Sequence, residues 1–252
     1  MAILTQAEIA RKLRGEDLDK WLELWRAEQG PAKRGSLELM AAAIPFSTDD
    51  NLRVLDICCG PGDAGRAIFS RFPNACVDFA DRDLFFTALC FAVNQRDGVP
   101  GRTFVRDLLD PNWHRDLTNS YNVVVAANGL HWFRLKRAAE LFADVYELLR
   151  PNGSFLFMEP AGPETPFAAG FAMWKHTQPS QHKSDDWTKF WSSVNHLLGY
   201  DHIKELGERD DSRIDDKLSV LGWVGLLRAA GFGSIDILLR DAEKVVVAAL
   251  KL

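Results

Sequence analysis

The residues best suited to binding a ligand lie between positions 54 and 65. Asp56 ends an apolar run, and Gly60, Gly62 and Gly65 follow it closely. Glycines allow the backbone to approach a ligand, and the start of the helix expected over 64–72 offers unpaired N–H groups. The spacing predicts a strand, a tight loop and a helix that together hold a nucleotide-like ligand.

Two interpretations of this loop compete. The three glycines fit the G-x-G-x-x-G fingerprint of dinucleotide-binding proteins, which is a weak signal by itself. The Asp56 carboxylate favours another ligand, because it would repel a pyrophosphate and attract a cationic amino-acid end. Leu55, Asp56, Gly60 and Gly62 resemble the first motif of the class I S-adenosylmethionine-dependent methyltransferases. Cys58 replaces the first glycine of that motif, a mild departure provided that its φ angle is negative.

The resemblance implies further cofactor contacts at the ends of the next two strands. Asp81 should accept the ribose hydroxyls; Asp83 is the alternative, although it is also expected to cap the next helix. Asp107 should accept the adenine amino group beside Leu108, and its competing role is a turn or helix cap. The full set of predicted cofactor-binding residues is Asp56, Cys58, Gly60, Gly62, Asp81, Arg82, Asp107, Leu108 and Asn128.

His131 is the predicted catalytic residue. It follows the fourth predicted strand, in a segment that passes beside the reactive methyl group in the family. Imidazole exchanges protons near neutral pH, so His131 is suited to act as a general base towards a hydroxyl or carboxyl acceptor. The competing interpretation is a structural histidine packed beside Trp132.

Asn128, in place of an aspartate after this strand, argues against the metal-dependent catechol type. The chain also lacks an Asn-Pro-Pro-Tyr-like motif, which argues against an amide-nitrogen acceptor.

Aromatic side chains are concentrated in residues 159–211 and in the N-terminal helix around Trp21 and Trp25. Together they would form a lid that excludes water and holds a flat or apolar acceptor. The competing interpretation is the core of a small helical cap. The histidines at 176, 182, 196 and 202 lack the spacing of zinc ligands on one helix face, so we predict no metal. The predicted substrate-binding residues are Trp21, Trp25, His131, Trp132, Phe171, Trp174 and Trp191.

Composition excludes several classes of protein. The 252 residues are 47% apolar and 26% charged, as expected for one globular α/β domain. A net charge of −5 argues against a nucleic-acid partner. No apolar run approaches the ~20 residues that span a bilayer, and the first residues lack a signal-peptide pattern, so we expect a cytoplasmic protein. The four cysteines are expected to be buried free thiols in a reducing compartment.

The periodicity of the chain predicts alternating strands and helices. We expect strands over 53–57, 75–80, 102–105, 122–127 and 154–158, and a turn at 150–153. Helices are expected from the capping box at Thr5, and over 17–28, 36–43, 84–94, 135–149 and 217–230, the last ending at Gly231. The final strands, 234–239 and 244–250, should pair antiparallel because the link between them is too short for a crossover.

These elements predict one domain with a Rossmann-like three-layer α/β fold. Its seven-stranded, mostly parallel sheet would end in an antiparallel strand, as in the methyltransferases and unlike a dinucleotide domain. Residues 36–158 and 212–252 would form the core, 1–35 a helical cap, and 159–211 a cover for the acceptor.

The predicted function is methyl transfer from S-adenosylmethionine to a carboxyl or hydroxyl oxygen of a metabolite or natural product, by a monomer or homodimer. Alternatives are a carbon or nitrogen acceptor, S-adenosylmethionine binding without methyl transfer, and an NAD-dependent oxidoreductase.

Overall fold

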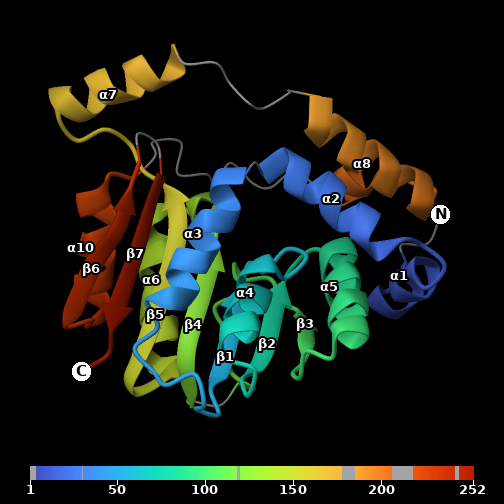
Figure 1. Ribbon diagram of the computed structural model, residues 1–252, viewed down its shortest axis with the longest axis horizontal. Helices are drawn as coiled ribbons and strands as arrows, with labels where there is room; N and C mark the ends of the chain where they lie inside the picture. Colours follow the sequence, from blue (N-terminus) through green and yellow to red (C-terminus); the bar gives the residue numbers. More distant parts are fainter. Residues whose placement is uncertain (1–3, 30, 118–119, 178–184, 206–217, 242–243) are drawn as a thin grey trace.

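Seven strands form one sheet in the order β3-β2-β1-β4-β5-β7-β6 (Figure 1). The computed structural model describes residues 4–29, 31–117, 120–177, 185–205, 218–241 and 244–252. The strands are β1 (Arg53–Ile57), β2 (Cys76–Asp81), β3 (Thr103–Val105), β4 (Tyr121–Ala127), β5 (Leu149–Pro160), β6 (Ser234–Arg240) and β7 (Lys244–Leu250). The first five strands pair in parallel, whereas β7 runs antiparallel to both β5 and β6. The predicted fold and its antiparallel closing pair are therefore confirmed.

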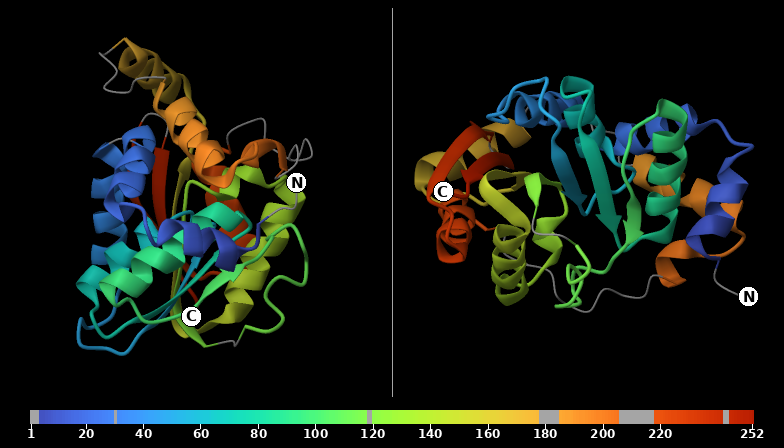
Figure 2. Two further views of the ribbon diagram at one scale, coloured as in Figure 1. Left: turned by 90° about the vertical axis from the view of Figure 1, so that its right-hand side faces the viewer. Right: turned by 90° about the horizontal axis from the view of Figure 1, so that it is seen from below.

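Helices cover both faces of the sheet (Figures 1 and 2). They are α1 (Gln6–Leu13), α2 (Leu18–Gln29), α3 (Pro31–Ala42), α4 (Asp63–Arg71), α5 (Leu84–Asp97), the 3-10 turn η1 (Leu130–Trp132), α6 (Leu135–Leu148), α7 (Pro166–His176), α8 (Asp185–Leu198), α9 (His202–Glu205) and α10 (Val220–Ala230). Val124 of β4 belongs to the buried cluster that includes α6 and α10, while Val123 and Val125 belong to the cluster with α3 and α4. A continuous apolar strand is needed here because both of its faces are covered.

The strand β5 is longer than predicted. Leu149 already pairs with Tyr121, and regular pairing with β4 resumes where Ser154 faces Val123. The residues between them bulge, with Asn152 at a φ angle of 61°. The predicted turn at 150–153 is thus an irregularity inside the strand, because a bulge interrupts the pairing without ending it.

Two helices begin at other positions than predicted. α3 starts at Pro31, five residues before the predicted start at 36. Proline is well tolerated there because the first helical N–H has no partner within the helix. The predicted start of the last helix, residue 217, lies outside the described residues; α10 begins at Val220 after the cap Ser219. Gly231 ends it with a φ angle of 104°, as predicted.

The N-terminal helices form a cap with part of the segment that follows β5. α1 starts at the predicted capping box, in which Thr5 and Glu8 bond each other's backbone N–H groups. α1 packs on α5, α2 packs on α8, and the side chains of all four share one buried cluster. α7 lies apart from α8, on the side of β6 and β7 (Figure 1). Over the described ranges, no helix combines the length and apolarity that crossing a membrane requires.

Candidate active site

The loop after β1 contains three residues in the left-handed region of the backbone map. The φ angles are 51° at Cys58, 53° at Gly60 and 90° at Gly62. The expectation of a negative φ at Cys58 is wrong, so a side chain occupies a conformation that favours glycine. A Cβ added to Gly129 would lie 2.3 Å from the Cys58 Cβ. The loops that follow β1 and β4 therefore touch at this point, and the close contact requires a residue without a side chain on the β4 side.

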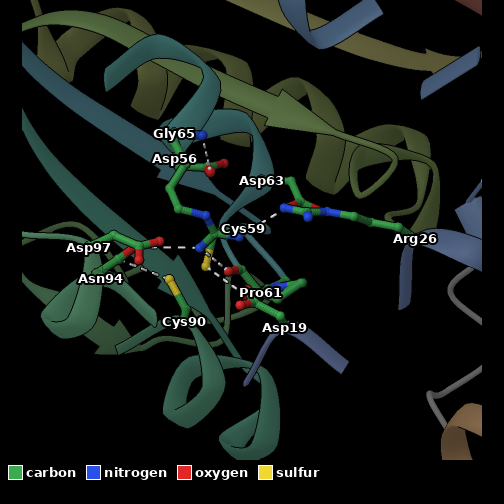
Figure 3. Close-up of polar contacts among 12 residues, drawn as sticks. Asp19, Arg26, Asp56, Cys59, Pro61, Asp63, Gly65, Cys90, Asn94 and Asp97 are labelled. Carbon is green, nitrogen blue, oxygen red and sulfur yellow. Dashed lines mark hydrogen bonds and ion pairs between the residues drawn. The ribbon is translucent and has the colours of Figure 1, made fainter. Parts of the chain in front are cut away.

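Asp56 lies beneath the loop. Its side chain is fully buried, and Oδ2 accepts the Gly65 N–H at 2.8 Å (Figure 3). The carboxylate therefore faces the positive end of the α4 dipole. A Cβ added to Gly65 would lie 2.4 Å from the Phe79 ring, so helix packing against β2 explains the third glycine. Direct contact between Asp56 and a cationic ligand stays a prediction.

Asp81 connects the glycine loop to the start of α5. Oδ2 accepts the Gly60 N–H and Oδ1 accepts the Asp83 N–H, both at 2.9 Å. Asp83 is the N-cap of α5, as predicted, and its Oδ1 accepts the Phe85 and Phe86 N–H groups. The half-buried Asp81 is thus the carboxylate that lies beside the loop, while Asp83 is buried at the start of α5.

The other predicted cofactor residues on this side lie at the ends of β2 and β3. Arg82 Nη1 and Asp107 Oδ2 are 4.0 Å apart, and both side chains are partly exposed. Asp107 also accepts the Leu109 N–H at 3.0 Å, so it makes the turn contact that was the competing role. Leu108 is buried, and its carbonyl accepts from Arg137 at 2.7 Å.

The segment after β4 is held by a buried carboxylate. Glu159, near the end of β5, has no exposed surface. Oε1 accepts the Gly129 and Leu130 N–H groups at 2.8 and 2.7 Å. Oε2 accepts the His131 N–H at 3.3 Å and lies 2.7 Å from His131 Nδ1. Asn128 precedes this turn with a φ angle of 58° and donates its N–H to the Met158 carbonyl.

These contacts assign the protons of the His131 ring. Glu159 already accepts three backbone N–H groups, and we assign His131 Nδ1–H as the fourth donor to this carboxylate. In this tautomer Nε2 is the ring nitrogen that can accept a proton, and 29% of the His131 side chain is exposed. Glu159 is not among the residues predicted for the site. Its signal was present, because Glu159, like Asp56 and Asp81, follows the apolar part of a central strand.

Comparison with known proteins identifies the fold and the domain. Residues 54–153 match the family model described as a methyltransferase domain. Over residues 54–153 the chain therefore contains a methyltransferase domain. The search of curated proteins gave no match.

Solved structures of methyltransferases share the fold at low sequence identity. An O-methyltransferase family protein from Burkholderia thailandensis aligns with a TM-score of 0.58 at 15% identity, over 87% of this chain and 56% of that one. Human N-acetylserotonin methyltransferase, solved with S-adenosylmethionine, aligns with a TM-score of 0.54 at 14% identity, over 98% of this chain and 56% of that one. The CurJ carbon methyltransferase aligns with a TM-score of 0.55 at 18% identity, over 82% of this chain and 50% of that one. The chain thus spans about half of the length of these structures.

The methyltransferase domain can accommodate its cofactor at the Asp81 turn. Each carboxylate oxygen has about two acceptor sites, so Asp81 can accept hydroxyls in addition to the two N–H groups that it holds. A Cβ added to Gly60 would meet only Trp25, at 3.8 Å, so the Gly60 backbone is not crowded by other side chains on the side of α2. The geometry and the donor set therefore fit a ribose beside a glycine loop.

Helix α2, which precedes the matched residues, covers the glycine loop. The Trp25 ring faces Gly60, and Arg26 Nη2 lies 2.8 Å from Asp63 Oδ1 at the start of α4 (Figure 3). Arg66 also bonds Asp63 and, in addition, the Pro61 carbonyl. Trp25 thus lies beside the glycine loop, and its predicted contact with the acceptor stays a prediction.

The other predicted aromatic residues separate into two groups. Trp21 and Trp191 are buried, and both contact Phe190 in the core of the cap. Phe171 and Trp174 lie on α7, stacked with centroids 5.8 Å apart and largely exposed. The expectation that all four line one surface is not met, because α7 lies apart from α8, on the side of β6 and β7 (Figure 1). Trp132 contacts His131 with ring centroids 5.1 Å apart.

The histidines and thiols complete the list of reactive groups. His182 lies outside the described residues, His196 is exposed and His202 is buried. Cys59 and Cys90 are buried as predicted, but Cys76 is exposed because it lies at the outer start of β2. Burial and the hydrogen bond with Cys90 raise the pKa of the Cys59 thiol well above its ordinary value, which keeps the thiol protonated and unreactive.

Proposed function

We propose that the protein methylates an oxygen atom of a small carboxylic acid, phenol or other hydroxyl compound. The observation that supports this best is the pair formed by His131 Nδ1 and the buried Glu159 carboxylate, 2.7 Å apart. A carboxylate that fixes the tautomer of a histidine is the arrangement expected of a general base. Oxygen acceptors need such a base, because they lose a proton as they become nucleophiles.

Different predicted residues bind different parts of the cofactor in this proposal. When bound, S-adenosylmethionine supplies an electrophilic methyl carbon that is transferred by in-line displacement, with S-adenosylhomocysteine as the leaving group. Asp81 binds the ribose hydroxyls, Asp107 and Arg82 lie towards the adenine, and Gly60 and Gly62 let the loop approach the methionine part.

His131 performs the proton transfer in this proposal. Nε2 takes the proton of the acceptor hydroxyl while the acceptor oxygen forms its bond to the methyl carbon. Glu159 stabilises the resulting imidazolium and keeps the ring oriented through its bond to Nδ1. Most of the rate enhancement comes from alignment and exclusion of water, because the methyl group is already reactive.

The acceptor site is proposed between the cap and the turn that carries His131. Trp25, on the cap side, and Trp132, beside His131, provide flat apolar surfaces for an aromatic or apolar acceptor. The α7 pair Phe171 and Trp174 is a further candidate surface, exposed and already stacked. A protein acting on small metabolites or natural products would use such surfaces for orientation.

A screen with two variants tests the proposal. Release of S-adenosylhomocysteine is measured with carboxylic acids, phenols and carbon acids as acceptors. His131→Ala should lower kcat for an oxygen acceptor by about 10²–10⁴-fold, with little change in cofactor affinity. His196→Ala, on the exposed side of α8, is the matched control and should retain full activity.

Other outcomes favour the alternatives. Methylation of carbon acids alone would favour a carbon acceptor, an alternative that the likeness to the CurJ carbon methyltransferase keeps open. Cofactor binding without transfer to any acceptor would favour a protein that binds S-adenosylmethionine without using its methyl group. Full activity of His131→Ala over the pH range would contradict the role of His131.

A further inference from the structure

A buried histidine from the cap contacts the turn that carries the proposed ribose acceptor. His202 starts the short helix α9, which follows α8. Its Nε2 lies 2.9 Å from Asp83 Oδ1, and the two residues are 2% and 4% exposed. They are 119 positions apart in the sequence, so this contact exists only because the cap folds back onto the start of α5.

The direction of this hydrogen bond follows from the other contacts of Asp83. Oδ1 also accepts the Phe85 and Phe86 N–H groups, at 2.8 and 3.1 Å. An oxygen that caps a helix in this way belongs to an ionised carboxylate, so His202 Nε2 carries a hydrogen and donates it. Hydrogen bonds to a buried charged group are among the stronger ones in a protein.

His202 is itself fixed to the cap. Its backbone N–H donates to Asn195 Oδ1 of α8 at 2.9 Å. Its ring stacks on Trp191 of α8, with centroids 5.9 Å apart and an interplanar angle of 22°. A displacement of α8 would therefore move the His202 ring and break its bond to Asp83.

On the other side, Asp83 is connected to the cofactor site. Its backbone N–H donates to Asp81 Oδ1, and Asp81 Oδ2 accepts from the N–H of Gly60, each at 2.9 Å. The hydrogen bonds thus run from the cap through His202, Asp83 and Asp81 to the glycine loop. A displacement of one of these residues would therefore displace the residue to which it is hydrogen-bonded.

We infer that His202 is a positioning residue that couples the α8–α9 cap to cofactor binding. With its bond to Asp83 formed, the turn holds the Asp81 carboxylate in the orientation that accepts the ribose. By reciprocity, a bound cofactor stabilises the cap that covers the acceptor. The inference rests on the proposed role of Asp81 in binding S-adenosylmethionine.

Two substitutions separate the hydrogen bond from the packing. His202→Phe retains a ring that can stack on Trp191 but has no donor for Asp83. His202→Gln loses the ring but retains an N–H close to the position of Nε2. His196→Ala, an exposed histidine on the same segment, is the matched control.

The experiment combines calorimetric titration with S-adenosylhomocysteine and amide hydrogen exchange in α8. We expect His202→Phe to weaken binding by about tenfold, the factor that corresponds to losing one hydrogen bond to a charged group. In this variant the ligand should no longer slow exchange in α8. His202→Gln should bind within about threefold of the wild type, and KM for S-adenosylmethionine should rise in His202→Phe with little change in kcat.

The outcomes distinguish the inference from the proposed function. If wild-type protein fails to bind S-adenosylhomocysteine, the proposed function fails and the inference fails with it. If the wild type binds but His202→Phe binds equally well, or if the ligand still slows exchange in α8, the coupling is absent while the proposed function stands. A loss of thermal stability in His202→Phe with unchanged affinity would mean a structural role only.

Discussion

The helices α7 and α8 come from the same aromatic-rich segment but have opposite environments. On α8, Phe190 is fully buried and Trp191 nearly so. On α7, Phe167 is 90% exposed and Trp174 57% exposed. Both helices are rich in aromatic residues, so composition alone does not determine which side chains become buried in the core. The difference arises because α8 packs on α2 and on the rings at the start of α5, while α7 lies apart on the side of β6 and β7.

The contrast assigns different roles to the two halves of the segment. α8 stabilises the fold of the cap and, through His202, the cofactor turn. α7 is tied to the end of β6 by the ion pair of Lys175 with Asp241, and its aromatic side chains are exposed. We expect changes in α8 to alter stability and cofactor affinity, and changes in α7 to alter the affinity for the acceptor.

The largest effect is expected from the buried phenylalanine of α8. Phe190→Ala should lower the free energy of unfolding by about 3–5 kcal/mol, because it leaves a cavity among several packed aromatic rings. Phe167→Ala on α7 is the matched control, and should change stability by no more than about 0.5 kcal/mol. Urea denaturation measures both. Equal effects would mean that α7 is packed as closely as α8.

A smaller effect is expected for cofactor affinity at the end of β2. Asp81→Ala should weaken S-adenosylhomocysteine binding by about 1–3 kcal/mol, because a charged acceptor of the ribose hydroxyls is lost. Calorimetric titration gives the value, with Trp174→Ala on α7 as the control that should bind normally. Unchanged affinity in Asp81→Ala would move the ribose contact to another residue, such as Asp83.

The smallest effect is expected from the open face of α7. Trp174→Ala should raise KM for an aromatic acceptor by about two- to tenfold, the range that the loss of one aromatic stacking contact allows. Stability and cofactor affinity should stay close to the wild type. An unchanged KM would remove α7 from the acceptor site and leave Trp25 and Trp132 as the candidate surfaces.

Much of the fold could be predicted because its signals are local. The run at 53–57 is a strand at the predicted positions. Gly231 ends α10, and the short link before Lys244 forces the antiparallel pair. The bulge inside β5 escaped prediction, because turn-forming residues look the same whether or not pairing resumes beyond them.

The candidate site was predictable only in part. Asp81 and His131 were found because each follows a strand whose end lies at the edge where ligands bind in this class of fold. The backbone strain at Cys58 was not found, since it depends on how closely the loops after β1 and β4 meet. Glu159 had the same local signal as Asp81, but its partners became apparent only when the loop after β4 was placed.

The sequence by itself determined the order of the strands and helices, the glycine loop and the carboxylates at the strand ends, because these follow from neighbouring residues. Only the tertiary structure decided that Glu159 orients His131 and that His202 bonds Asp83, since each pair joins residues far apart in the chain. It also decided that α8 is core while α7 is open. An aromatic residue becomes core only when another apolar surface covers it, and its own sequence does not specify that surface.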